Sequence, residues 1–274
     1  MEIHGYDFTS APKRSKPITQ AVCDLSNGVL SLHELRRHIC FDRFEGALAS
    51  SGPWIAAIDF PFGQPRKLIE NLGWPKTWDG YVRVVESIGP DGFVNAITTY
   101  TECREQGDKQ HRRVCDVAAR SISPMKLSFT PVGRMFMRGA PLLRRSSVSV
   151  LPFRFNDHER IIVEGYPALV ARRWIGKRSY KQDDKTKQTD AQAAARRDVI
   201  NALRSEACRE CYAAKLELYD DQADKLVADP TADELDAVLC AIQAAWAYEQ
   251  RQHGYGIPST ADRLEGWIVD PGLA

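Results

Sequence analysis

The stretch that decides the fold is MEIHGYDFT, residues 1–9. Ile3, Tyr6 and Phe8 are apolar or aromatic and suit a pleated strand, with one glycine as a weak point. Asp7 stands inside this run, and a buried carboxylate needs a charged partner, hydrogen bonds or a metal ion. Taken alone, Asp7 is equally well explained as a residue that caps a loop at the strand end. Its interpretation depends on whether other carboxylates occupy similar positions.

Three antiparallel strands and a helix are predicted to open the domain. After the first strand, residues 17–25 and 29–32 are β-rich, and Asn27-Gly28 between them is the strongest short hairpin signal. Residues 33–50 carry apolar residues at helical spacing with charged residues between them, so we expect an amphipathic helix there. Gly52-Pro53 ends this helix.

The fourth strand contains a second carboxylate. Residues 54–60, WIAAIDF, are nearly all apolar, which is typical of a strand buried on both faces, and Asp59 lies near its end. If the first and fourth strands are parallel neighbours, Asp7 and Asp59 project from the same end of the sheet, where α/β sheets place their sites. Residues 160–167, RIIVEGYP, repeat the pattern with Glu164 followed by a breaker.

A fourth carboxylate opens a helix near the C-terminus. Residues 229–234, DPTADE, predict a helix start with Thr231 as N-cap and Glu234 as its capping-box partner. Asp233 and Glu234 are explained by capping, because a helix N-terminus tolerates acids. Asp236 lies beside the apolar stripe of this helix, where capping does not account for it.

Asp7, Asp59, Glu164 and Asp236 therefore form one candidate set. Carboxylates gathered at one place repel each other unless cations hold them. Oxygen ligands suit Mg²⁺ or Mn²⁺ rather than zinc. Two such ions about 4 Å apart stabilise the attacking and leaving oxygens of a phosphodiester displacement. The residues predict a metal-dependent phosphoryl-transfer site, most simply a nuclease.

The charge distribution predicts a phosphate-bearing partner. The formal net charge is only +1, but residues 104–145 hold ten Lys or Arg and three Asp or Glu, about +7, whereas residues 205–274 hold five and fourteen, about −9. A basic middle segment, with a Lys-rich loop at 177–187, suits nucleic acid or another phosphoester. For any single charge, a solvated helix face is at least as common an explanation.

Length and composition indicate an ordinary globular protein. The 274 residues, 43% of them hydrophobic, predict a single domain over 1–274 with a helical and loop insertion at roughly 62–150. Apolar runs are far shorter than the roughly 20 residues of a membrane span, and residues 1–9 have no signal-peptide core, so we expect a cytoplasmic protein without a membrane partner. Seven scattered cysteines favour free thiols, although Cys208 and Cys211 have a spacing also found in zinc sites.

The order of elements, with an Asp in the first strand, resembles the ribonuclease H-like fold. More closely, the chain is similar to the family called domain of unknown function 429, regarded as predicted nucleases of that fold. The similarity rests on short pieces between residues 5 and 268, which are Gly5-Tyr6-Asp7, Ile58-Asp59-Phe60-Pro61, Arg113-x-Cys115-Asp116 with Arg120, Glu164-Gly165-Tyr166-Pro167, Tyr180-Lys181, Leu235-Asp236-Ala237 and Glu265-Gly266-Trp267-Ile268.

The resemblance implies an α/β fold whose mixed sheet, three antiparallel strands and then parallel strands, is flanked by helices. It implies Mg²⁺ or Mn²⁺ bound by Asp7, Asp59 and Asp236, with Glu164 as a fourth or alternative ligand. The family's His-Pro-Glu is replaced here by Glu164-Gly165-Tyr166-Pro167-Ala168, so the family's glutamate need not coincide with Glu164. Family positions at the cleft and the basic middle segment together predict phosphate-binding residues, which are Arg113, Arg120, Lys126, Arg134 and Lys181.

Two other functions compete with a nuclease. A non-catalytic nucleic-acid or nucleotide-binding module on the same fold would keep the basic segment without requiring the carboxylates to meet. A nucleotide-dependent phosphotransferase is disfavoured, because the sequence contains no Gly-rich phosphate loop. His4 and His111 are candidate helpers in catalysis, but each is more commonly a surface or structural histidine.

Overall fold

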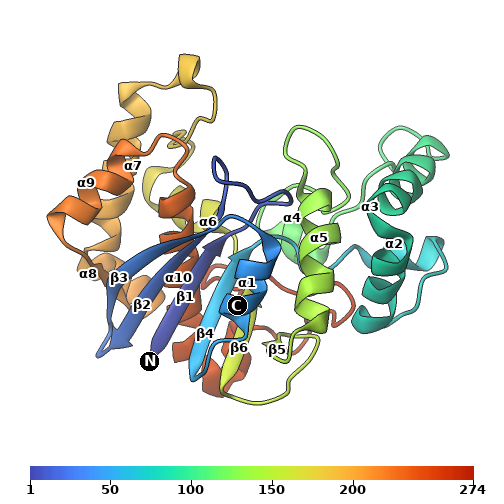
Figure 1. The fold of residues 1–274 in the computed structure, drawn as a ribbon, viewed down its shortest axis with the longest axis horizontal. Coiled ribbons are helices and arrows are strands. Elements are labelled where there is room, and N and C mark those ends of the chain that lie inside the picture. Colours follow the sequence, from blue (N-terminus) through green and yellow to red (C-terminus); the bar gives the residue numbers. More distant parts are fainter.

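The computed structural model describes the backbone of all 274 residues and every side chain except that of Lys185. A seven-stranded mixed sheet with the order β5-β6-β4-β1-β2-β3-β7 runs through the molecule (Figure 1). Its strands are β1 (Glu2–Asp7), β2 (Ile18–Ser26), β3 (Val29–His38), β4 (Trp54–Asp59), β5 (Ser149–Val150), β6 (Arg160–Glu164) and β7 (Lys215–Glu217).

Helices cover both faces of this sheet. On one face α10 packs against β1, β4 and β2, with α6 and the α7–α9 helices beside it. On the other face lie α1, α2, α3 and α5. The helices are α1 (Phe41–Leu48), α2 (Arg66–Asn71), α3 (Trp78–Glu102), α4 (Val114–Ala118), α5 (Val132–Arg145), α6 (Pro167–Ile175), α7 (Asp190–Leu203), α8 (Glu206–Tyr212), α9 (Asp220–Ala228) and α10 (Asp233–Glu249), with short 3-10 turns η1 (Lys185–Lys187) and η2 (Arg251–Gly256).

The predicted fold class is confirmed. Strands β1, β2 and β3 pair antiparallel, and β1–β4, β4–β6 and β5–β6 pair parallel. The connection from β4 to its parallel neighbour β6 contains helices α2 to α5. This topology is consistent with the ribonuclease H-like fold.

Three local predictions were wrong. Residues 33–38 continue strand β3 instead of starting the helix, because long antiparallel pairing with β2 outweighs the helical spacing of their apolar residues. The sequence also predicts a helix over residues 191–219, but residues 215–217 form edge strand β7. Thr231 does not cap α10: its hydroxyl donates to Asp229, and Ala232 occupies the N-cap position.

Gly5 determines how closely α10 approaches the sheet. A Cβ atom built on Gly5 would lie 2.0 Å from the carbonyl oxygen of Ala237 and 2.2 Å from the amide nitrogen of Ala241. Only a residue without a side chain allows the α10 backbone to lie directly on β1. This close contact brings the first turn of α10 beside the carboxyl end of β1.

Candidate functional site

Asp7 and Asp59 lie side by side at the carboxyl ends of two parallel strands. They are direct partners in the β1–β4 register. Because side chains alternate along a strand, Asp7 follows Ile3 and Asp59 follows Ile55 and Ala57 onto the face covered by α10. Both carboxylates are partly buried, and neither forms a hydrogen bond or ion pair with any side chain or backbone group that the structure describes.

Asp236 joins this pair from the first turn of α10. Its side chain is fully buried and accepts a hydrogen bond from Tyr180 Oη at 2.6 Å and one from Lys181 Nζ at 2.5 Å. Lys181 comes from the segment between α6 and α7, and its side chain is 47% exposed. The ammonium therefore enters the carboxylate cluster from the solvent side.

The protonation of the cluster reflects crowded negative charge. Burial and the nearby charge of Asp236 raise the pKa of the Asp7 carboxyl well above its usual value. Burial raises the pKa of Asp59 to about 7, with the charge of Lys181 acting in the opposite direction. Burial lowers the pKa of Lys181, but the surrounding carboxylates, Asp236 foremost, raise it well above its usual value. Lys181 is therefore the cation that partly balances three closely placed carboxyl groups.

Glu164 points to the opposite face of the sheet. Its register partner is Ile58, which packs under the helices of the other face, one residue short of Asp59. The residue that lies next to Asp59 on the face covered by α10 is Gly165. A Cβ atom added to Gly165 would lie 3.3 Å from the Cβ of Ala57. The period of two along the strand thus separates Glu164 from the other three carboxylates.

Both oxygens of Glu164 have protein partners. Arg113 donates to Oε1 at 2.5 Å and to Oε2 at 2.8 Å, and the Phe62 amide donates to Oε2 at 2.8 Å. Arg113 also pairs with Asp116 at 2.8 Å, and all three charged side chains are 1–2% exposed. Burial raises the pKa of Glu164, and the charge of Arg113 opposes that rise. The roles of Glu164 as a metal ligand and of Arg113 as a phosphate ligand stay predictions, and in this structure the two side chains are paired with each other in a buried network.

Two further residues belong to the cluster that sequence reasoning missed. Asp233, assigned to helix capping, has a pKa raised by burial, and its charge acts on Asp7. Cys240 lies one turn beyond Asp236 on α10 and is fully buried; burial, then the charges of Asp59 and Asp236, raise the pKa of its thiol. Residues 232–240, ADELDAVLC, contained a signal for both, since positions 233, 236 and 240 share one helix face.

The other predicted phosphate ligands lie on the surface around α4 and α5. Arg120 and Arg134 are exposed and Lys126 is partly buried. A small cavity of about 50 Å³ links this region to the carboxylates, since its lining includes Asp59 as well as Ser121 and Val132. The two histidines lie elsewhere: His4 stacks on Trp54 and hydrogen-bonds Glu2, and His111 hydrogen-bonds Tyr100.

The donor set fits a hard divalent cation in its chemistry. Asp7, Asp59 and Asp236 offer carboxylate oxygens, and Asp7 and Asp59 have no partner in the described part of the structure. Among the side chains that the structure describes, however, no three His, Cys, Asp or Glu residues are already arranged as a ligand group. The ammonium of Lys181 is paired with Asp236, so it takes one of the carboxylates that a metal ion would need. The cysteines are all free thiols, as predicted, including Cys208 and Cys211.

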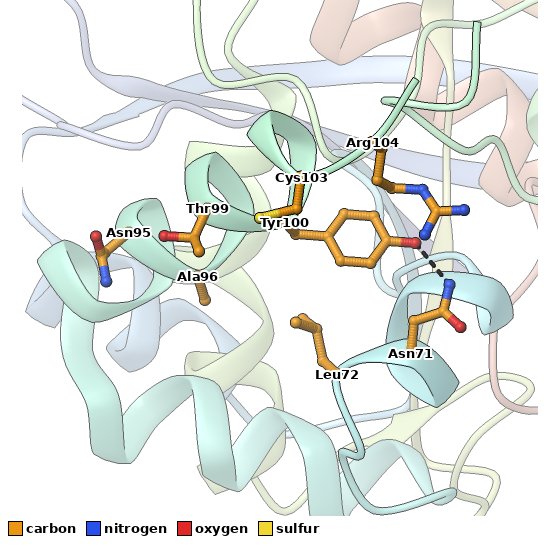
Figure 2. Close-up of a pocket in the computed structure, with 8 residues that line it drawn as sticks. All are labelled: Asn71, Leu72, Asn95, Ala96, Thr99, Tyr100, Cys103 and Arg104. Atoms are coloured by element: carbon orange, nitrogen blue, oxygen red, sulfur yellow. Dashed lines mark hydrogen bonds between the residues drawn. The ribbon is translucent and has the colours of Figure 1, made fainter. Parts of the chain in front are cut away.

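A larger hollow of about 530 Å³ lies between α2 and α3 (Figure 2). Two of its polar side chains contact Tyr100: Asn71 donates to Tyr100 Oη at 2.8 Å, and Arg104 stacks over the Tyr100 ring at 5.0 Å. No carboxylate or histidine is among the described residues that line this hollow. The carboxylate cluster remains the candidate site.

The fold and the cluster define an α/β protein with a ribonuclease H-like topology and acidic residues at the carboxyl ends of its central strands. The model of the family described as "Protein of unknown function (DUF429)" matches residues 15–262, and the chain belongs to this family. Comparisons with the curated proteins and with the solved structures gave no significant match. Among the described residues, no helix combines the length and the apolar character that a membrane span requires.

Proposed function

We propose that this protein is a metal-dependent nuclease whose site consists of Asp7, Asp59 and Asp236. The observation that carries the proposal is the pairing of Asp7 with Asp59, two adjacent carboxylates with raised pKa values beside a third. Neither of the two has a partner among the groups that the structure describes. Such an arrangement costs free energy in the resting protein, and a bound cation would recover it. A site that stores this kind of electrostatic strain is a functional candidate.

The three carboxylates would bind the metal ion from two different elements of the fold. Asp7 and Asp59 would hold a Mg²⁺ or Mn²⁺ ion from the sheet, and Asp236 would hold it from α10. When bound, the ion supplies positive charge to the phosphoryl oxygens and lowers the pKa of a bound water. Glu164, with Arg113, keeps the end of β6 and helix α4 in a fixed position beside Asp59.

Lys181 gives the site a resident cation in the absence of metal. Its ammonium lies on Asp236, and the charges of Asp7 and Asp59 act on it. We infer that metal binding requires Lys181 to leave Asp236, which frees the ammonium for a substrate phosphate. This accounts for the incomplete ligand group among the described side chains and keeps Lys181 in its expected role.

The alternative is a nucleic-acid-binding module without catalysis. The pairing of Lys181 with Asp236 is the observation that favours it, because a permanent ion pair would leave no room for metal. The two proposals differ in one measurable property. The nuclease must bind a divalent cation at Asp7 and Asp59, and the binding module need not.

The deciding experiment is a Mn²⁺ titration followed by electron paramagnetic resonance, on the wild type and on Asp7→Asn and Asp59→Asn. We expect wild-type binding below millimolar Mn²⁺ and loss of that binding in both variants. Asp220→Asn is the matched control, because Asp220 is 91% exposed at the start of α9, just after β7, the edge strand three places from β1 in the sheet order. If all four proteins bind Mn²⁺ equally, or none does, the metal-dependent mechanism is wrong.

A nuclease assay on single-stranded, duplex and hybrid oligonucleotides follows the titration. Cleavage should require Mg²⁺ or Mn²⁺ and should disappear in the Asp7→Asn and Asp59→Asn variants while Asp220→Asn retains it. Metal binding without cleavage of any of these substrates would leave a metal-binding phosphoester hydrolase of another specificity and would exclude the nuclease.

A further inference from the structure

The segment between α4 and α5 presents an aromatic side chain that packing does not explain. Phe129 is 98% exposed and has a φ of +61°, in the left-handed region that bulky residues avoid. Both the exposure of the ring and the backbone conformation are unfavourable for an isolated protein. Strain combined with exposure at one residue is the kind of observation from which a functional role is inferred.

Other exposed apolar side chains lie in the same stretch of chain as Phe129. Val114 and Val117 on α4 are 63% and 54% exposed, and Ile122 in the following segment is 39% exposed. Arg120, between them, also has a positive φ of 53°. We call this group, made of Val114, Val117, Ile122 and Phe129, the α4 apolar surface. Apolar side chains clustered in one short stretch at this exposure indicate a binding surface.

The stretch that contains the α4 apolar surface also contains cations that have no ion pair among the described side chains. Elsewhere in the basic segment, Arg104 pairs with Asp108, and Arg144 and Arg145 pair with Glu86. By contrast, Arg112, Arg120 and Lys126 form no ion pair with any side chain that the structure describes. Three cations without an ion pair among the described residues therefore lie in the same stretch of chain as the exposed apolar groups.

Exposed apolar side chains together with these cations favour one class of binding partner over others. A polyanion with apolar faces, such as an unpaired nucleic-acid strand, offers phosphates to the cations and bases to the aromatic and aliphatic side chains. A duplex offers the phosphates but keeps its bases stacked inside, so it would leave Phe129 exposed. An acidic protein would satisfy the cations without needing a strained aromatic tip.

The location suits a substrate contact. Ser121 and Ile122 at one end of the segment, and Val132 at the other, line the small cavity that reaches Asp59. Figure 1 shows this green segment standing at the same end of the sheet as the carboxyl ends of β1 and β4. A strand held on it would pass close to the carboxylate cluster.

We propose that the α4 apolar surface binds single-stranded nucleic acid, with Phe129 stacking on a base and Arg112, Arg120 and Lys126 holding phosphates. This deepens the proposed function, on which it rests for its biological meaning, by naming the form of the substrate. It specifies a strand with unpaired bases rather than a regular duplex.

The test measures the affinity for a labelled twelve-nucleotide oligothymidine by fluorescence anisotropy, in EDTA so that no metal contributes. Phe129→Ala should weaken binding about 5-fold or more, because stacking of one base on an aromatic ring is lost. An abasic oligomer with the same number of phosphates should bind the wild type more weakly by a similar factor, and it should bind Phe129→Ala and the wild type equally. Arg120→Asn should instead lower the dependence of log K on log salt by about 1, since asparagine tolerates the positive φ but has no charge.

Tyr219→Ala is the matched control. Tyr219 is another exposed aromatic residue, 76% exposed before α9, and its loss should leave binding unchanged. The proposal is overturned if the wild type does not bind the oligothymidine, if it binds the abasic oligomer as tightly, or if Phe129→Ala has no effect. Because the assay contains no metal, failure here leaves the Mn²⁺ titration and the proposed metal site unaffected, and failure of the metal site leaves this result unaffected.

Discussion

Asp7 and Asp59 occupy directly paired positions on the parallel strands β1 and β4, and neither carboxylate has a hydrogen-bond or ion-pair partner among the described residues. The parallel register forces the two side chains onto the same face and the same edge of the sheet. The approach of α10 then adds Asp236 to them. The site is therefore a direct consequence of how one helix packs on two strands, and its components can be tested separately.

Replacing Gly5 by alanine should separate the helix from the sheet. The new Cβ would overlap the backbone of Ala237 and Ala241, which cannot move without shifting α10. We expect a loss of about 3 kcal/mol in the free energy of unfolding, at the upper end of typical overpacking, and weaker Mn²⁺ binding because Asp236 moves away. Urea unfolding measures the first effect. Gly46→Ala is the control: Gly46 is in α1 with nothing within 4 Å of the added Cβ, so this change should stabilise the protein by about 0.5–1 kcal/mol.

Removing the ammonium of Lys181 should lower the stability of the metal-free protein and raise its affinity for Mn²⁺. In Lys181→Met the three carboxylates lose their resident counter-charge, so the metal-free protein should unfold at a lower temperature. The same loss removes the competitor for Asp236, and Mn²⁺ affinity should rise about tenfold, the effect of one short-range charge interaction. Lys187→Met in the same segment, with a 69% exposed side chain, should change neither property. Weaker Mn²⁺ binding in Lys181→Met would contradict the competition.

The metal-free protein should lose stability as the pH rises towards 7. The Asp59 carboxyl has a pKa of about 7 in the folded protein and an ordinary value of 3.8 when unfolded. Between these values the folded state holds more protons than the unfolded state, so the free energy of unfolding falls with increasing pH. Asp59→Asn removes this term, and above pH 7 its melting temperature should exceed that of the wild type by about 3 °C or more. The difference should vanish near pH 4, and excess Mn²⁺ should remove it at high pH. Calorimetry in EDTA across pH 4–8.5 provides the measurement, and equal melting temperatures throughout would show that Asp59 is not destabilised by its surroundings.

Arg113 should be a structural residue. Arg113→Met leaves Asp116 and Glu164 buried without their shared cation, and breaking a buried pair in this way costs about 3–5 kcal/mol. Arg112→Met is the control on the adjacent, exposed arginine and should change the free energy of unfolding by less than about 0.5 kcal/mol. Glu164→Gln completes the comparison: it should destabilise the protein but leave Mn²⁺ affinity unchanged once folded. Loss of Mn²⁺ binding in a folded Glu164→Gln protein would show that Glu164 contributes to the metal site.

Much of the fold was predictable because its signals are local. The Asn27-Gly28 hairpin, the apolar run of β4 and the breakers that follow Asp59 and Glu164 each depend on a few neighbouring residues. Residues 33–38 were assigned to the wrong element because their spacing also fits a helix, and only the pairing with β2 decides between the two.

The sequence by itself determined that carboxylates would stand at the ends of central strands, because strand ends and their acidic residues can be read from local patterns. Only the tertiary structure decided which of them meet. Every residue of β6 from Ile161 to Glu164 is buried, so no alternation of polar and apolar residues marks which face a side chain takes. The register against β4 assigns Glu164 to one face and Asp59 to the other. The packing of α10 over Gly5 then completes the cluster with Asp236, through contacts between residues more than 200 positions apart in the chain.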